Sequence, residues 1–153
     1  MIAVIQRTYS PAEVRVDHKT IGQISKGLVI LLGVNKGDDE KDAQILADKI
    51  IHLRIFNDEN EKMNISLKDL GGEALIISQF TLSGNCKKGR RPGFDNAEIP
   101  AKAEALYEYF QSLFQRQDIK TASGEFGAMM EVDFINSGPV TFVLDSKDLQ
   151  TKT

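Results

Sequence analysis

The sequence has few of the side chains that enzymes use most often as catalysts or metal ligands. Its 153 residues include one cysteine, Cys86, and two histidines, His18 and His52. One cysteine cannot form an internal disulfide, which is typical of a reducing compartment, and these three residues are too few for a structural zinc site. We therefore expect no metal and no cofactor.

Long apolar runs and an excess of positive charge are also missing. No run approaches the roughly 20 apolar residues that span a bilayer, and residues 1–7 lack the basic start and long apolar core of a signal peptide. These absences predict a cytoplasmic protein without a membrane partner. The net charge of −3 gives no general attraction for DNA or RNA, so nucleic-acid binding would need a local basic patch.

The pattern that is present predicts strands separated by two main helices. Alternating or continuous apolar residues predict strands at 2–7, 12–17, 21–24, 28–34, 53–56, 73–82, 129–135 and 140–144. Helical spacing predicts one helix after Asp39 and a second that begins near Pro100. This order predicts an α+β fold with a mixed, barrel-like sheet flanked by two main helices, in a single domain over residues 1–153.

Three details of this prediction are specific enough to check. The run 28–34 is apolar on both faces, which predicts a central strand covered on both sides. The second helix should bury its apolar residues, which are Ala101, Ala105, Leu106, Tyr109, Phe110, Leu113 and Phe114. Residues 146–153 are expected to form a frayed tail.

The strand predicted at 73–82 becomes polar at its end, in Ser78-Gln79-Phe80-Thr81-Leu82. Ser78 and Thr81 are candidate nucleophiles, but a hydroxyl is weak unless a neighbouring base takes its proton, and both histidines are expected on the surface. Backbone N–H groups at Gln79, Phe80 and Thr81 could instead stabilise an oxyanion, at about 3 kcal/mol per donor. The alternative is an ordinary edge strand with alternating exposure.

A Gly-Pro step separates the last two predicted strands, in Asn136-Ser137-Gly138-Pro139-Val140-Thr141. Proline has no N–H for the sheet ladder, so the step predicts an interruption. Glycine allows the backbone to approach a ligand more closely than any other residue. We expect this step to lie near the polar end of the strand at 73–82. A tight hairpin turn without a site is the alternative.

Taken together, these two stretches resemble the signature motifs of the D-aminoacyl-tRNA deacylases. Other segments resemble that family in order and spacing, namely residues 3–7, 27–34, 56–59, 62–64, 66–67, 71–73, 91–92, 106–107 and 126–129. The resemblance thus covers nearly the whole chain. Two positions depart from it, because Ile2 stands where arginine is expected and Gly93 where serine is usual.

The resemblance implies an enzyme that hydrolyses the ester between a D-amino acid and the terminal adenosine of tRNA. It also implies removal of glycine wrongly attached to tRNA, so that the activity would proofread translation. Ser78, Gln79, Phe80 and Thr81 would be the catalytic residues. The substrate's own ribose 2′-hydroxyl would assist, which suits a chain without a protein base.

The resemblance further implies a homodimer in which Gly138-Pro139, joined by a cis bond, reaches into the partner's pocket. Asn136, Gly138, Pro139, Val140 and Thr141 would bind the substrate. If the carbonyls of Gly138 and Pro139 face the substrate's amino group, the backbone accepts one enantiomer of the amino acid and collides with the side chain of the other. Glycine, which has no side chain to collide, would pass.

Four basic residues, Lys87, Lys88, Arg90 and Arg91, lie in the loop predicted at 83–95. Under this resemblance they are candidates for contacts with tRNA phosphates, which would give salt-sensitive binding that is largely blind to sequence. A solvated loop is the alternative.

Two other functions stay open. A non-catalytic, dimeric RNA-binding protein would use the pocket only to hold a tRNA end, which agrees with the missing base and the basic loop. A generic esterase would instead use Ser78 or Thr81 as its nucleophile.

Overall fold

The computed structural model describes residues 1–150 of the chain, in which helices separate groups of consecutive strands. In chain order the elements are β1 (Ile2–Thr8), β2 (Ala12–Val16), β3 (Lys19–Ile24), β4 (Gly27–Gly33), α1 (Glu40–His52), β5 (Arg54–Asn57), β6 (Met63–Ser66), α2 (Leu67–Leu70), β7 (Glu73–Ser78), the 3₁₀ turn η1 (Phe80–Ser83), α3 (Pro100–Gln115), β8 (Thr121–Ser123), β9 (Glu131–Asp133), β10 (Thr141–Asp145) and α4 (Ser146–Leu149). None of the helices in this described part is long and apolar enough to span a bilayer.

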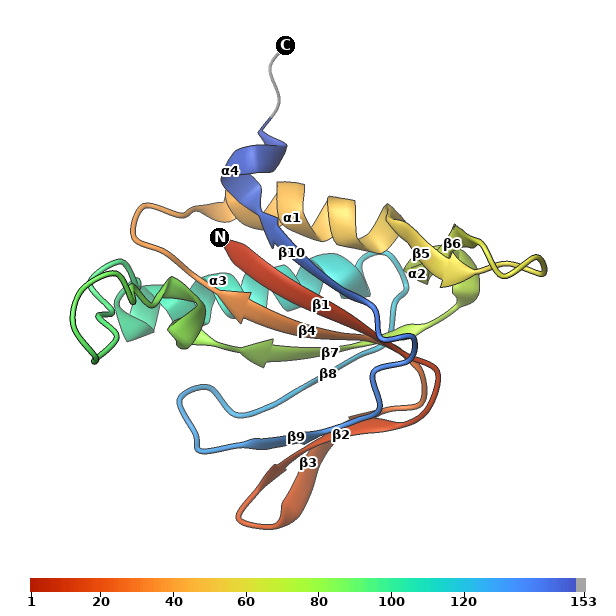
Figure 1. Cartoon of the computed structure of the whole chain (residues 1–153), viewed down its shortest axis with the longest axis horizontal. Coiled ribbons are helices and arrows are strands. Elements are labelled where there is room, and N and C mark those ends of the chain that lie inside the picture. The colour runs from red at the N-terminus through yellow and green to blue at the C-terminus, as the bar shows by residue number, and fades with distance from the viewer. Residues whose placement is uncertain (151–153) are drawn as a thin grey trace.

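A five-stranded mixed sheet in the order β10-β1-β4-β7-β8 forms the middle layer. Strand β1 is antiparallel to both β10 and β4, whereas β7 is parallel to β4 and β8. The two long helices α1 and α3 cover one face, and a three-stranded sheet, β3-β2-β9, lies beyond the other (Figure 1). The predicted mixed α+β fold is confirmed. Within residues 1–150 the sheets stay separate and do not close into a barrel.

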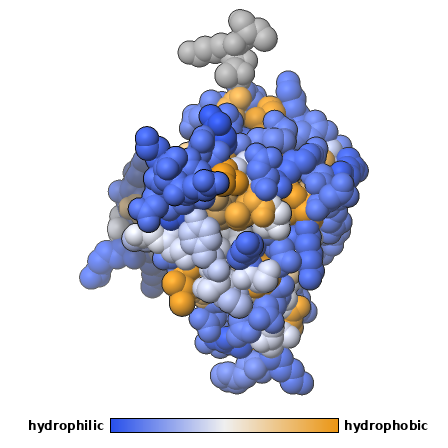
Figure 2. All heavy atoms as spheres, turned by 90° about the vertical axis from the view of Figure 1, so that its right-hand side faces the viewer, coloured by the Kyte–Doolittle hydropathy of each residue, from blue (hydrophilic) through white to orange (hydrophobic). Residues whose placement is uncertain are grey.

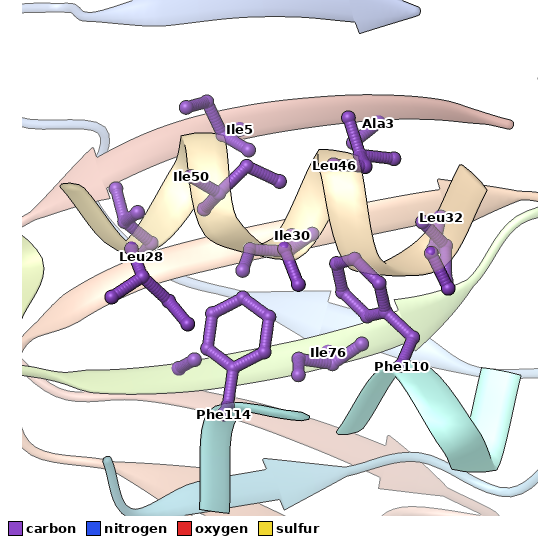
Figure 3. Close-up of a cluster of buried hydrophobic side chains, with 14 of the residues drawn as sticks. Ala3, Ile5, Leu28, Ile30, Leu32, Leu46, Ile50, Ile76, Phe110 and Phe114 are labelled. Carbon is purple, nitrogen blue, oxygen red and sulfur yellow. The ribbon is translucent and has the colours of Figure 1, made fainter. Parts of the chain in front are cut away.

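The central strand β4 is apolar on both faces because both faces are covered, as the run 28–34 predicts. On one face, Leu28, Ile30 and Leu32 belong to the larger core with α1 and α3. Figure 3 shows these residues together with Ala3, Ile5, Leu46, Ile50, Ile76, Phe110 and Phe114. On the other face, Val29 packs in a second core with residues of β2, β3 and β7.

Helix α3 begins at Pro100 as predicted, but its buried face is partly different. Leu106, Phe110 and Phe114 are buried, while Ala101 and Ala105 are exposed. The buried positions follow the large side chains at helical spacing, and the remaining members of that face are Ala103 and Tyr107. An alanine fits either face of a helix, so it is a weak guide to burial.

The last described residues are anchored, so the expected frayed tail is wrong for α4. The Ser146 hydroxyl accepts a hydrogen bond from the Met1 ammonium at 2.9 Å and donates one to Asp42 at 2.8 Å. The same ammonium forms a buried ion pair with Asp38 at 2.8 Å. These contacts fix α4 against the start of α1. Residues 151–153 of the expected tail lie outside the described residues.

The two signature stretches also depart from simple strands. Strand β7 ends at Ser78 rather than at Leu82, because the chain turns into η1. Strands β9 and β10 belong to different sheets, so they do not form the hairpin that was the alternative for the Gly-Pro step. Residues 134–140 instead carry the chain from one sheet to the other.

Candidate functional site

The carboxyl end of β7 forms the first half of the candidate site. Ser78 is level with Leu32 of β4, and the N–H of Gln79 donates to the Leu32 carbonyl at 2.8 Å. That N–H is therefore committed to the sheet, and the expectation that Gln79 supplies an oxyanion donor is wrong. Among the described residues no side chain caps η1, so the N–H groups of Phe80 and Thr81 at its start are free to donate.

The Thr81 hydroxyl is oriented by its neighbour rather than activated by a base. The side-chain amide of Gln79 donates to Thr81 Oγ1 at 2.5 Å. The side chains of His18 and His52 are 94% and 50% exposed, and neither lines the pocket beside Gln79. This geometry positions a hydroxyl without removing its proton, which favours a site that acts by hydrogen bonding.

A pocket of about 520 Å³ opens beside these residues. Ser78, Gln79 and Phe80 contribute to its wall, and Thr81 stands outside the lining. The rest of the wall is largely apolar and consists of Leu32, Val34, Ile77, Ala97, Glu98, Pro100, Ala103, Phe126, Gly127, Ala128, Met129, Met130 and Val132. Polar groups at one edge of an apolar pocket are the usual arrangement of a small-molecule site.

Glu98 is the carboxylate in this wall, and its oxygens are already engaged. It accepts hydrogen bonds from the N–H groups of Ile99 at 3.0 Å and Gly37 at 3.3 Å, and it pairs with Lys102 at 3.2 Å. The hydrogen bond from Ile99 is the main cause that lowers the pKa of Glu98. A carboxylate with a lowered pKa is a weaker base, so Glu98 is better suited to stabilising the start of α3 than to accepting a proton from the substrate.

Tyr107 holds β7 just before the pocket. Its hydroxyl donates to the Ile76 carbonyl at 2.6 Å from the buried face of α3. Burial raises the pKa of Tyr107 to about 12, so the hydroxyl keeps its proton and remains a donor at neutral pH. The position of Ser78 thus depends on contacts from both sheet and helix.

The second signature stretch is a loop that its own side chains and Arg7 hold in place. Asn136 Oδ1 accepts from the N–H of Val140 at 2.7 Å, and Asn136 Nδ2 donates to Thr141 Oγ1 at 2.9 Å. Val140 is buried, while Gly138 and Pro139 are exposed. The loop therefore presents the Gly-Pro step on the outside of a fixed turn.

Arg7 is the buried cation beneath this loop, with 4% of its surface exposed. Its guanidinium donates to the carbonyls of Ser137 at 3.0 Å and Ile55 at 2.9 Å, and to Asn57 Oδ1 at 3.1 Å. It also lies 4.9 Å from the centre of the Tyr9 ring. The backbone of Arg7 exchanges further hydrogen bonds with Ser137 and Val140. One side chain thus ties the loop to β1 and β5.

Gly138 is required where it stands. Its φ is +137°, a conformation that side chains of L-residues rarely adopt. A Cβ there would lie 2.7 Å from Val140 Cγ2 and 3.1 Å from Arg7 Nη2. The peptide bond between Gly138 and Pro139 is cis, as the resemblance implies.

The two stretches lie at opposite ends of the five-stranded sheet, so within one chain the Gly-Pro step is not near the polar end of the strand at 73–82, contrary to the expectation. Ser78 is level with Leu32 and hence with Ala3, whereas Thr141 is level with Gln6 near the other end of β1. In the order β10-β1-β4-β7 they are also three strands apart, about 14 Å at the usual spacing. Figure 1 shows η1 at the left end and the loop before β10 at the right.

The basic residues of the predicted loop lie on the pocket's side of the molecule and are all exposed. Lys87, Lys88 and Arg91 line a shallow hollow of about 380 Å³ together with Asn85, Gly93, Asp95 and Asn96. Arg90 is outside this lining. Three of the four cations therefore line one hollow. A loop that is merely solvated gives no reason for its cations to gather in this way.

Arg7, Glu98 and the pocket wall at 126–130 are missing from the predicted site residues, although residues 3–7 and 126–129 belong to segments that resemble the family. Arg7 had a usable signal, because it continues the alternation of Ala3 and Ile5 along β1, and the structure buries all three. For Glu98, the signal is an acid just before a helix start. No periodicity marks 126–130, which is irregular between β8 and β9.

Comparison of the sequence with known families matches residues 4–145 to one described as "D-Tyr-tRNA(Tyr) deacylase". A relative from Sulfurihydrogenibium sp. (strain YO3AOP1), named "D-aminoacyl-tRNA deacylase", is 56% identical over 149 residues. That alignment covers 97% of this chain and 100% of the relative.

Two solved structures resemble the fold over nearly the whole chain. One, named "c-Myc DNA Unwinding Element Binding Protein", has a TM-score of 0.87 at 38% identity and covers 95% of this chain and 98% of its own. The other, described as a probable eukaryotic D-amino acid tRNA deacylase, has a TM-score of 0.80 at 18% identity, with coverage of 94% and 98%. At that identity the second likeness concerns the fold alone.

The bonds of Arg7 predict that its replacement by lysine loosens the Gly-Pro loop. A single ammonium cannot match the fork of the guanidinium, so the half-buried carbonyl of Ser137 and the buried carbonyl of Ile55 cannot both keep a donor, at about 1–3 kcal/mol of folding stability. In Arg7→Lys, amide hydrogen exchange at Ser137 should accelerate. Arg15→Lys, which changes an exposed ion pair on β2, should leave that exchange as it is. Equal exchange in both variants would contradict the role of Arg7.

Proposed function

This chain belongs to the D-Tyr-tRNA(Tyr) deacylase family and is therefore a hydrolase, and we propose that it cleaves the ester of D-aminoacyl-tRNA while sparing the L form. The products are the free amino acid and tRNA. Glycine wrongly attached to tRNA is a second substrate. The reaction proofreads translation, because it returns mischarged tRNA to the pool.

The pocket at the end of β7 is the observation that carries this proposal. Its edge supplies the Ser78 hydroxyl and the side-chain amide of Gln79, and the N–H groups of Phe80 and Thr81 lie at the turn that follows. Backbone donors at the start of a helical turn are suited to the oxygen of a carbonyl that becomes negative during hydrolysis. The apolar remainder of the wall suits the side chain of the amino acid.

Water is the nucleophile in this proposal, and the substrate assists it. With the ester carbonyl against Phe80 and Thr81, a water molecule attacks the carbonyl carbon, the ester C–O bond breaks and the ribose oxygen leaves with a proton. The ribose 2′-hydroxyl, adjacent to the reacting ester, helps to move that proton. Thr81 hydrogen-bonds and orients, since no base next to it is available to make it a nucleophile.

Chirality is read by the backbone of Gly138 and Pro139. Their carbonyls accept the substrate's amino group, and in that orientation the side chain of an L-residue points into the loop while that of a D-residue points into the pocket. Asn136, Val140 and Thr141 support this arrangement through the hydrogen bonds that fix the loop. Selectivity comes from the collision. Glycine has no side chain to collide and is hydrolysed.

A homodimer brings the two halves of the site together, with the Gly138-Pro139 step of one chain in the pocket of the other. Three features support this. The halves are far apart within one chain, the Gly-Pro step is exposed, and the three-stranded sheet packs on β4 and β7 but leaves β1 and β10 open. On that open face Val143 of the edge strand β10 is 70% exposed.

The end of the molecule that carries the Gly-Pro loop has the surface of an interface. Figure 2 shows hydrophobic residues gathered near the middle of this end, with hydrophilic residues around them. Tyr9 and Ile135, which are 42% and 68% exposed, adjoin the loop. Exposed apolar patches with a polar rim often mark contacts with another protein chain.

The tRNA partner is held by the basic hollow. Lys87, Lys88 and Arg91 line it, and Arg90 extends the same charge along the loop. Such contacts bind phosphates without reading bases, so binding weakens as salt rises.

The function predicts chiral release from tRNA. With one amino acid attached to the same tRNA in D and L forms, the protein should release the D form and glycine, and leave the L form intact. Release is measured as free amino acid over time, with a protein-free reaction as control. Tight tRNA binding without release would instead identify a binding protein, and equal release of both hands would exclude the Gly-Pro loop as the filter.

Thr81 distinguishes a positioning site from an esterase with a protein nucleophile. Thr81→Ala removes one hydrogen-bonding group, so kcat for D-aminoacyl-tRNA should fall by about tenfold. Loss of a covalent nucleophile typically costs on the order of 10⁶-fold in kcat. A 2′-deoxy terminal adenosine should impair the reaction more than Thr81→Ala does. Abolished activity in Thr81→Ala would refute the water mechanism.

A further inference from the structure

Two phenylalanine rings form an exposed aromatic step at the mouth of the pocket. Phe80 and Phe94 are 59% and 36% exposed. Their centres are 5.1 Å apart and their planes are inclined by 64°, so the pair is edge-to-face. In such a pair the ring that contributes its edge keeps both faces clear of the other ring. At least one aromatic face of the step is therefore not packed against the other ring of the pair.

The step lies between the pocket and the basic hollow. Phe80 lines the pocket, while Gly93 and Asp95, on either side of Phe94, line the hollow with Lys87, Lys88 and Arg91. The chain thus places an apolar pocket, an aromatic step and a cluster of cations in succession.

The backbone fixes Phe94 in this position. Asn85 and Gly93 exchange two hydrogen bonds, at 2.7 and 2.8 Å, which close the base of the basic loop directly before Phe94. The ring also packs on Gly84, where an added Cβ would lie 3.3 Å from Phe94 Cε1. A ring held on two sides is a rigid surface, and stacking on it requires little ordering.

We propose that Phe94, supported by Phe80, stacks an unpaired base of the RNA 3′ end, namely the base that precedes the terminal adenosine. The inference rests on the proposed function, which puts the terminal ester in the pocket. The preceding phosphates then lie over Lys87, Lys88 and Arg91. Aromatic rings beside a cationic groove are how proteins hold single-stranded nucleic acid without reading its sequence.

The local charge favours RNA over a second copy of the chain. The whole protein has a net charge of −3, yet the loop that frames the step carries four cations and, at its end, one carboxylate, Asp95. A second copy of the chain also has a net negative charge, but its own matching loop is basic, so the two copies would gain little attraction at this place. A polyanion with unpaired bases matches both the cations and the ring.

The experiment compares two substrates with the same D-aminoacyl ester, one on full-length tRNA and one on adenosine alone. The adenosine ester lacks the base that the step is proposed to hold. Phe94→Ala should lower kcat/KM about tenfold more on tRNA than on the adenosine ester, mainly through KM. Phe94→Tyr keeps the ring and should restore the tRNA value. Met63→Ala removes an exposed side chain from the distant β6 and should change neither value.

Phe94→Leu separates stacking from packing, because leucine fills much of the same space without an aromatic face. It should behave as Phe94→Ala does. The proposal is overturned if Phe94→Leu has the wild-type kcat/KM on tRNA, or if Phe94→Ala lowers kcat/KM equally on both substrates. It is also overturned if Phe94→Ala changes the oligomeric state, since a second copy would then cover the step. If the wild-type protein releases the D-amino acid from neither substrate, the proposed function itself fails, and that result is distinct from the others.

Discussion

The register of β1 against its two neighbours is the constraint on which the rest of this structure depends. Because β1 runs antiparallel to both β4 and β10, and β7 runs parallel to β4, the end of β7 and the start of β10 lie at opposite ends of one sheet. A shift of one residue would turn Ala3 and Ile5 out of the core, so this register is firmly set. Both candidate motifs are thus fixed in place, and fixed apart.

The chemistry that we propose relies on position more than on reactive side chains. Burial keeps the Tyr107 hydroxyl protonated, so this hydroxyl can hold β7 through its hydrogen bond to the Ile76 carbonyl. The hydrogen-bonded pairing with β4 holds β7 from its edge. The turn into η1 then leaves N–H groups at the mouth of an apolar pocket. In the mechanism that we propose, preorganised donors of this kind need no rearrangement as charge develops, so a chain with two exposed histidines can act as a hydrolase.

Most of the fold can be predicted from the sequence, because periodicity reports which faces are covered. The two-faced run 28–34 is the central strand, and the large side chains at 106, 110 and 114 face the core. Periodicity says nothing about side chains that bond to distant backbone. The anchoring of Ser146 by Met1 and Asp42, and of the Gly-Pro loop by Arg7, depends on contacts across more than 100 residues. The family motifs predict the site residues, but only the sheet's register shows that the two motifs are far apart in one chain.

The central claim is that each working site takes one motif from each of two chains, and mixing two damaged chains tests it directly. Phe80→Pro removes one backbone donor at the first position of η1, where proline is tolerated, and Gly138→Ala distorts the other motif. Each variant alone should release little D-amino acid. Co-expressed, they should regain activity, because some pairs combine an intact Phe80 from one chain with an intact Gly138 from the other. If the mixture is no more active than either variant alone, both motifs act within one chain and the account is wrong.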